Sequence, residues 1–185
     1  MEAGAGLPAD RCHAVWIRGA KSGNGVLLGR ERLLTARPLI STYHDASNTA
    51  VEAPTSHPSG DIATCCLDPA SCLLYNQTLE FSIVAIPPGF GAACGLVPVL
   101  MGEMHSFSKG QLLILVTSSH DPDTGHSHAI RLRVDEWDDT EVVMHATEGS
   151  SSCELGSPVF TISGQLVALV VRKAKSGGVV ATRAS

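Results

Sequence analysis

The sequence predicts an all-β fold of antiparallel strands with little helix, and three observations lead to it. Apolar runs of strand length recur along the chain, and Gly, Pro, Asp and Ser separate them. Apolar residues at helical spacing are almost absent. No helical crossover fits between successive runs, so neighbouring strands are expected to pair antiparallel. Many short strands with turn signals between them are typical of a barrel or a sandwich.

The expected strands follow the apolar runs in chain order: residues 14–18, 25–29, 32–36, 81–86, 96–100, 111–117, 129–134, 140–146, 158–162, 165–172 and 178–182. The glycine-rich segment 21–25 joins the first two as a hairpin, and Ser163-Gly164 forms a tight turn between two strongly apolar strands. Residues 41–79 have poor periodicity and many Ser, Thr, Pro and Asp residues, which predicts long loops with one or two short strands. The segment 87–91, Pro-Pro-Gly-Phe-Gly, predicts the start of a linker between two halves.

The composition excludes several classes of protein. Hydrophobic residues make up 44% of the 185 residues and charged residues 17%, which excludes an intrinsically disordered chain. No apolar run approaches the length of a membrane span, and residues 1–10 lack the features of a secretory signal. Eighteen acidic against 13 basic residues, a formal net charge of −5, argue against nucleic-acid binding. We therefore expect an intracellular protein with a flexible segment 1–10 and neither a membrane nor a nucleic-acid partner.

The six cysteines are expected to be reduced thiols, because the chain lacks an export signal. Cys65, Cys66 and Cys72 form the only cluster, and the Cys-x-x-Cys pair and fourth ligand typical of a zinc site are missing. The run 120–128 carries several His and Asp residues, but it lacks the closing Glu of a calcium loop. We expect no metal and no other cofactor.

Three segments in this order carry a resemblance to a known family. The first, residues 23–38, is a glycine hairpin, a strand, a short turn and the sequence Leu-Thr-Ala-Arg-Pro. The second, residues 79–86, is an acidic residue followed by an alternating apolar strand. The third, residues 153–160, reads Cys-Glu-Leu-Gly-Ser-Pro-Val-Phe, and a glycine turn and the strand Leu-Val-Ala-Leu follow it. Over about residues 12–182, the chain resembles the trypsin/chymotrypsin-like serine peptidases, closest to their intracellular and HtrA-type branches.

The resemblance implies two antiparallel β-barrels of the trypsin-like type, one over about residues 11–88 and one over about residues 95–185. These peptidases use a Ser nucleophile, a His base and an Asp that orients the His. Here the His position holds Pro38, the Asp position holds Glu80 and the Ser position holds Leu155. Pro38 is no base and Leu155 is no nucleophile, so the matched positions imply the fold together with loss of the activity.

Nearby residues offer substitutes for the lost groups. Cys153 lies two residues before the Ser position and Ser157 two residues after it, and both are alternative nucleophiles. His44 is the alternative base. The turn containing Cys153, Leu155 and Gly156 corresponds to the oxyanion-binding turn of the family, which uses the N–H of the nucleophile and that of a glycine two residues before it.

The sequence therefore predicts a pseudoprotease that binds a protein or an extended peptide by strand addition, or that associates with an active peptidase and regulates it. Leu155 would make the cleft of such a protein more apolar. The alternative is an active serine- or cysteine-type peptidase with a non-standard nucleophile, or a fragment or isoform of a longer protease.

Overall fold

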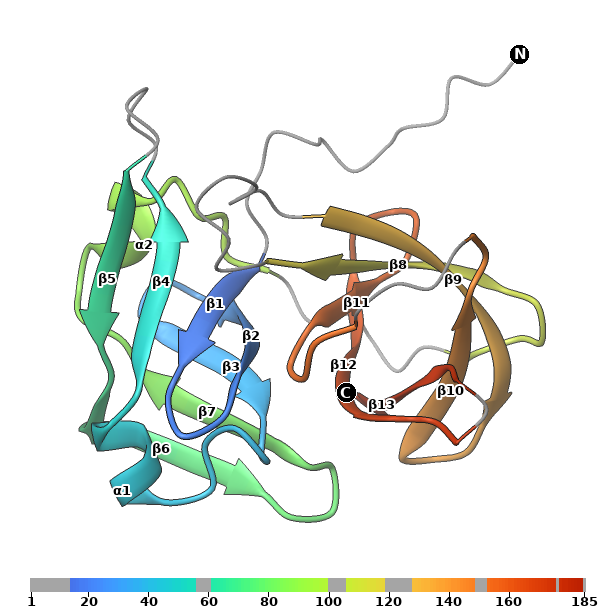
Figure 1. Ribbon diagram of the computed structural model, residues 1–185, viewed down its shortest axis with the longest axis horizontal. Coiled ribbons are helices and arrows are strands. Elements are labelled where there is room, and N and C mark those ends of the chain that lie inside the picture. The colour runs from blue at the N-terminus through green and yellow to red at the C-terminus, as the bar shows by residue number, and fades with distance from the viewer. Residues whose placement is uncertain are drawn as a thin grey trace.

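The computed structural model describes residues 14–55, 61–99, 106–118, 128–148, 153–175 and 177–184 (Figure 1). Within them, thirteen strands and two short helices form, so the predicted all-β fold with little helix is confirmed. Neither helix of this described part is long and apolar enough to cross a membrane. The segment 1–10, which we expected to be flexible, lies outside the described residues.

The amino-terminal half is one antiparallel sheet of seven strands in the order β5-β4-β1-β2-β3-β7-β6. Its strands are β1 (Val15–Arg18), β2 (Ser22–Leu28), β3 (Arg32–Ala36), β4 (Ala50–Pro54), β5 (Ile62–Cys66), β6 (Asp68–Asn76) and β7 (Phe81–Ala85). A hairpin joins β1 to β2 as predicted, but its turn lies at residues 19–21, because Ser22 to Gly25 already pair with β1. Apolar side chains of β1, β3, β4 and β7 fill the concave face of this sheet.

The two edge strands of this sheet are neighbours in the chain. β5 ends at Cys66 and β6 begins at Asp68, so Leu67 alone joins the two edges. A sheet whose opposite edges are one residue apart must roll up, because a flat sheet would hold its edges several strand spacings apart. The amino-terminal half is therefore a rolled sheet that its backbone joins at Leu67, without a hydrogen-bonded ladder between β5 and β6.

The region 41–79 is more ordered than its sequence indicates. The prediction of long loops with one or two short strands is wrong, because β4, β5 and β6 all form there, together with α1 (Tyr43–Ser47). The Thr42 hydroxyl caps α1 by accepting a hydrogen bond from the N–H of Asp45 at 3.0 Å. The strands escape notice because β5 has no buried residue and β6 contains an irregular stretch that begins at Asp68.

The carboxy-terminal half is a closed barrel in the order β10-β13-β12-β11-β8-β9. Its strands are β8 (Leu112–Thr117), β9 (His128–Trp137), β10 (Glu141–Ala146), β11 (Pro158–Phe160), β12 (Leu166–Lys173) and β13 (Val179–Arg183). The predicted tight turn joins β11 to β12, with Gly164 at a φ of 86°. Fully buried side chains such as Leu113, Leu132 and Met144 form the core of this barrel.

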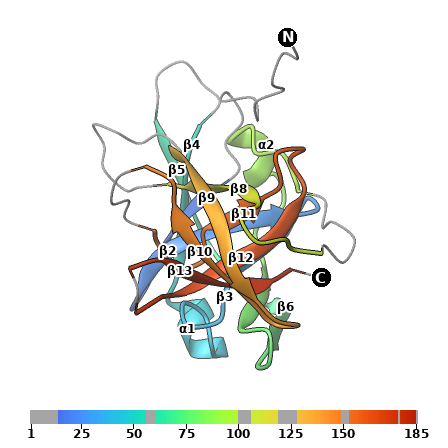
Figure 2. The same cartoon turned by 90° about the vertical axis from the view of Figure 1, so that its right-hand side faces the viewer.

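One predicted strand is absent. Residues 96–99 form no strand, and Val99 makes only an isolated parallel bridge with Leu28. The chain here runs along β2, and the Val99 N–H donates to the Leu27 carbonyl at 2.9 Å. The apolar run thus covers the seam between the halves. A short helix, α2 (Phe90–Ala93), precedes it, and Figures 1 and 2 show α1 and α2 at opposite ends of the amino-terminal half.

The two halves share one apolar cluster, so they pack as a unit. Val26 and Leu34 from the rolled sheet meet Phe160, Leu166 and Leu169 from the barrel in this cluster. All five side chains are almost completely buried. Close packing of this kind fixes the position of the loops that emerge at the seam.

Candidate functional site

The segment after β3 lies directly beside the segment before β7. The N–H of Arg37 donates to the carbonyl of Glu80 at 2.7 Å, and the N–H of Leu39 donates to Ala36 at 3.0 Å, which forms a tight turn around Pro38. This pairing extends the β3–β7 ladder, in which Ala36 faces Phe81. The residue before Pro38 is therefore hydrogen-bonded to Glu80, and the two segments lie side by side.

Glu80 has an unusual backbone. Its φ of 51° makes it the one non-glycine residue with a positive φ among the described residues. Such a conformation costs a residue with a side chain about 1–2 kcal/mol. Two residues on, the Ser82 hydroxyl donates to the Ile40 carbonyl at 2.5 Å, which fastens the strand after Glu80 to the turn after Pro38.

Leu155 reaches the same place from the carboxy-terminal barrel. Its carbonyl accepts a hydrogen bond from the N–H of Asn24 at 2.7 Å. A Cβ built on Gly23 would lie 2.5 Å from that carbonyl oxygen and 2.8 Å from Cδ1 of Leu39. Gly23 therefore touches both Leu155 and the residue after Pro38. The segments that carry the three matched positions therefore meet at the seam, beside Gly23.

The turn after Leu155 depends on glycine. Gly156 has a φ of 75°, and its N–H donates to the Val170 carbonyl at 2.7 Å. That N–H is consequently not available to a ligand. The N–H of Leu155 has no hydrogen-bond partner among the described residues, so this donor of the predicted oxyanion turn stays open. Cys153, which would supply the second donor, is 7% exposed.

The alternative nucleophiles are both buried. Ser157 is completely inaccessible to solvent, and its hydroxyl has no hydrogen-bond partner in the described part of the chain. A nucleophile must reach the substrate carbonyl, and a side chain enclosed on all sides cannot. The Cys153 thiol is buried within the apolar core of the barrel. Neither side chain therefore takes the place that Leu155 occupies at the seam.

His44 and His145 make contacts away from the alternative nucleophiles. His44 is an exposed residue of α1, and its ring lies 3.3 Å from the side-chain nitrogen of Asn48. His145 Nε2 is 3.7 Å from a carboxylate oxygen of Asp135 on the neighbouring strand. Because the Ser157 hydroxyl has no partner among the described residues, neither ring acts as its base. The predicted alternative base and nucleophile are thus not brought together.

No group of three metal-ligating side chains gathers within the described residues. Cys65 is half-buried and packs against the core of the rolled sheet, and burial, together with the nearby thiols of Cys94 and Cys66, raises its pKa to about 12. The His and Asp residues 120–126, which the sequence analysis compared with a calcium loop, lie outside the described residues.

Sequence reasoning missed the residue that ties the halves together. Asn24 is fully buried, its Oδ1 accepts from the N–H of Ser118 at 2.6 Å, and its Nδ2 donates to the Thr117 hydroxyl at 3.4 Å. The Thr35 hydroxyl donates to its carbonyl at 2.6 Å. The signal was a polar residue between two glycines inside an apolar strand, which indicates close backbone approach.

Among the described residues, one strand edge at the seam lacks a partner strand; its first residue, Val171, is 3% exposed, whereas Arg172 and Lys173 are exposed. β11 pairs with β12 as far as Leu169. The next residue, Val170, exchanges backbone hydrogen bonds with Gly156 and Ser157, which precede β11. Residues 171–173 continue beyond that point, and their other edge pairs with β13. Within the described chain, no strand covers the remaining edge of residues 171–173. An edge of this kind offers backbone donors and acceptors to an extended peptide.

A rolled sheet and a closed barrel, joined at a seam where these three segments meet, define the fold of the trypsin-like serine proteases. Solved structures support this assignment. The scabies mite inactivated protease paralogue S-D1 is 11% identical with a TM-score of 0.73, over 93% of this chain and 87% of that one. The active form of the Rv3671c protease from M. tuberculosis is 14% identical with a TM-score of 0.67, over 98% and 80%. Deg5 is 12% identical with a TM-score of 0.66, over 89% and 81%.

Comparison of the sequence itself gives no assignment. No family model matches the chain, and no curated protein matches it. The solved structures include both active and inactivated proteases, and at these identities they show the fold alone. Whether this chain retains activity must therefore be argued from its own residues.

Proposed function

We propose that this protein is a pseudoprotease that binds an extended peptide at the seam between its two halves. The observation that carries the proposal is the side chain at the Ser position. Leu155 has no nucleophilic atom, yet it is half-buried and packs against the apolar core of the rolled sheet. Pro38, at the His position, has no titratable group. Peptide-bond hydrolysis by this family requires both groups.

The same place is suited to peptide binding. The open edge of residues 171–173 can extend the β12 ladder by strand addition. Leu155 precedes Gly156, whose N–H holds Val170 at 2.7 Å, so an apolar side chain stands next to the start of that edge. A bound peptide would gain main-chain hydrogen bonds from β12 and bury an apolar side chain against Leu155.

Binding is tested with peptides selected from a displayed random library on the folded protein. Affinity is then measured for the wild type, for Leu155→Asp and for Ile162→Asp. Ile162 is the matched control because it is an exposed apolar residue at the tip of the β11–β12 turn. We expect Leu155→Asp to weaken the selected peptides at least about tenfold, which is about 1.4 kcal/mol, and Ile162→Asp to leave them unchanged. Equal losses in the two variants would contradict the proposed site.

Inactivity is tested separately with a fluorophosphonate probe. The wild type and Leu155→Ser should not label, because a serine without a base is a poor nucleophile. Adding Pro38→His to Leu155→Ser should give weak labelling, with Glu80 placed to orient the new imidazole. Peptidase turnover by the wild type that Cys153→Ala abolishes would show that the thiol is a nucleophile. Rapid labelling of Leu155→Ser alone would show that another histidine is a base, and either result would overturn the pseudoprotease assignment.

A further inference from the structure

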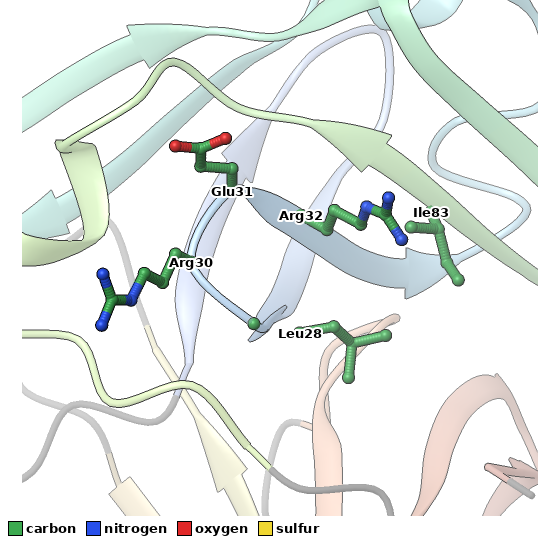
Figure 3. A pocket seen from close by; sticks show the side chains of 6 residues that line it. Leu28, Arg30, Glu31, Arg32 and Ile83 are labelled. Atoms are coloured by element: carbon green, nitrogen blue, oxygen red, sulfur yellow. The ribbon is translucent and has the colours of Figure 1, made fainter.

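A second surface feature lies on the amino-terminal half and shares no residue with the seam site. It is an open groove of about 560 Å³, which we call the β2–β3 groove, lined by Leu28, Gly29, Arg30, Glu31, Arg32 and Ile83 (Figure 3). The residues come from the end of β2, the turn to β3, the start of β3 and the middle of β7. None of them has a role in the proposed peptide site.

The floor of the β2–β3 groove is apolar and firmly held. Leu28 and Ile83 are partly buried and pack on the cluster shared by the two halves. Ile83 is paired on both sides, with Leu34 of β3 and with Leu74 of β6. Leu28 bridges to Val99. The floor is therefore rigid, and a ligand side chain placed on it would lose water contact without reorganising the protein.

The rim of the groove carries two arginines and one glutamate, so basic groups are in excess there. Arg30 and Arg32 are exposed, and neither forms an ion pair with a carboxylate of the described residues. Figure 3 shows the Arg30, Glu31 and Arg32 side chains pointing apart, with Arg32 beside Ile83. Other arginines of the protein do meet a carboxylate, as Arg172 does with Glu141 at 2.7 Å.

Space is open above the turn itself. A Cβ built on Gly29 would meet no heavy atom within 4 Å. The groove thus combines an apolar floor, two arginines without a described ion-pair partner and room for a chain to approach. A guanidinium binds a carboxylate through two parallel hydrogen bonds, and the apolar floor beside Arg32 suits a peptide that carries apolar and acidic side chains together.

From these observations we infer that the β2–β3 groove docks an acidic segment of a partner protein. The segment places an apolar side chain on Leu28 and Ile83 and separate carboxylates on Arg30 and on Arg32, whose side chains point apart. Charge complementarity selects the partner, and the apolar floor supplies the buried contact. This surface is independent of the peptide site, so either proposal can fail without the other.

The test uses two short synthetic amphipathic peptides, one of Leu and Glu and one of Leu and Lys, each labelled for fluorescence anisotropy. The protein is the wild type, the charge-reversed Arg30→Glu/Arg32→Glu, or the control Arg131→Glu/Arg133→Glu. The control changes the net charge equally at two exposed arginines of β9. Thermal unfolding of all three verifies that the variants remain folded.

We expect the wild type and the control to bind the Leu/Glu peptide at least about tenfold more tightly than the Leu/Lys peptide, because two exposed ion pairs together contribute a factor of this order. The groove variant should reverse the preference, and added salt should reduce it. Replacing the peptide's Leu residues with Ser should abolish binding. Saturable binding of neither peptide, equal binding of both by the wild type, or an equal loss in the control would overturn the inference.

Discussion

Gly156 and Gly29 provide a matched test of how tightly the seam is packed. Both have a left-handed backbone, with φ of 75° and 64°. They differ in the space around them. A Cβ on Gly156 would lie 1.9 Å from the carbonyl oxygen of Asn24 and 2.6 Å from the Thr35 hydroxyl oxygen, whereas a Cβ on Gly29 meets nothing within 4 Å. Replacing each glycine with alanine therefore separates the cost of the backbone conformation from the cost of the contact.

The expected magnitudes follow from the contacts. The left-handed conformation costs alanine about 1–2 kcal/mol, and this is the whole expected effect of Gly29→Ala on the free energy of unfolding. In Gly156→Ala, the new Cβ would overlap with the Asn24 carbonyl oxygen, so the backbone must also move apart there. This movement disturbs three short hydrogen bonds: Gly156 to Val170, Asn24 to Leu155 and Thr35 to Asn24. At about 1 kcal/mol for each bond, we expect a total loss of about 4–5 kcal/mol.

Urea denaturation followed by circular dichroism measures both variants. A domain of this kind is stable by about 5–15 kcal/mol, so Gly156→Ala should be severely destabilised or fail to fold, whereas Gly29→Ala should fold normally. Losses that agree within about 1 kcal/mol would refute the close approach of the Leu155 turn to β2. The proposed peptide site would then lose its structural basis, because that approach positions Leu155.

Two further predictions concern buried groups. Asn24→Ala should reduce the free energy of unfolding by about 2–4 kcal/mol, because it leaves the buried N–H of Ser118 without its acceptor and opens a cavity. The control Asn48→Ala, at an exposed position, should cost about 1 kcal/mol or less. Equal losses in urea denaturation would show that the Asn24 side chain contributes little. The pKa of Cys65, raised to about 12, favours the folded state below the ordinary thiol pKa of 9.0, and this contribution is lost as the pH rises from there toward 12. Site-resolved alkylation should therefore still accelerate for Cys65 above pH 9 in the folded protein and level off near pH 9 in urea, and identical profiles would contradict the burial of this thiol.

Sequence reasoning succeeds where both faces of a strand are buried. β12 has six consecutive buried residues from Leu166, and its apolar run and the preceding glycine turn identify it without ambiguity. β5 shows the opposite case, because its residues alternate between half-buried and exposed and none is fully buried. Such a strand is specified by its pairing with β4 rather than by its own composition, and a single sequence does not reveal that pairing.

The candidate site shows the same division. The matched positions Pro38, Glu80 and Leu155 come from segments that the structure brings to one seam, and the resemblance to the trypsin-like peptidases implied that they would meet. The open edge of residues 171–173 and the role of Asn24 were not predicted. Both depend on where β11 ends relative to β12 and on how closely β2 approaches the barrel, which are distances between elements and not properties of any one segment.

The single-residue connection at Leu67 makes the amino-terminal sheet sensitive to chain length. β5 and β6 lie at opposite edges of the sheet order, so the length of their connection sets how far the sheet must roll. One residue inserted beside Leu67 would reverse the faces of every following β6 residue, because side chains alternate along a strand. Two inserted residues would keep the faces but loosen the roll. Natural variation in length should therefore be absent from this joint, because Leu67 is also buried in the core of the rolled sheet, although the two strands that it joins are weakly buried.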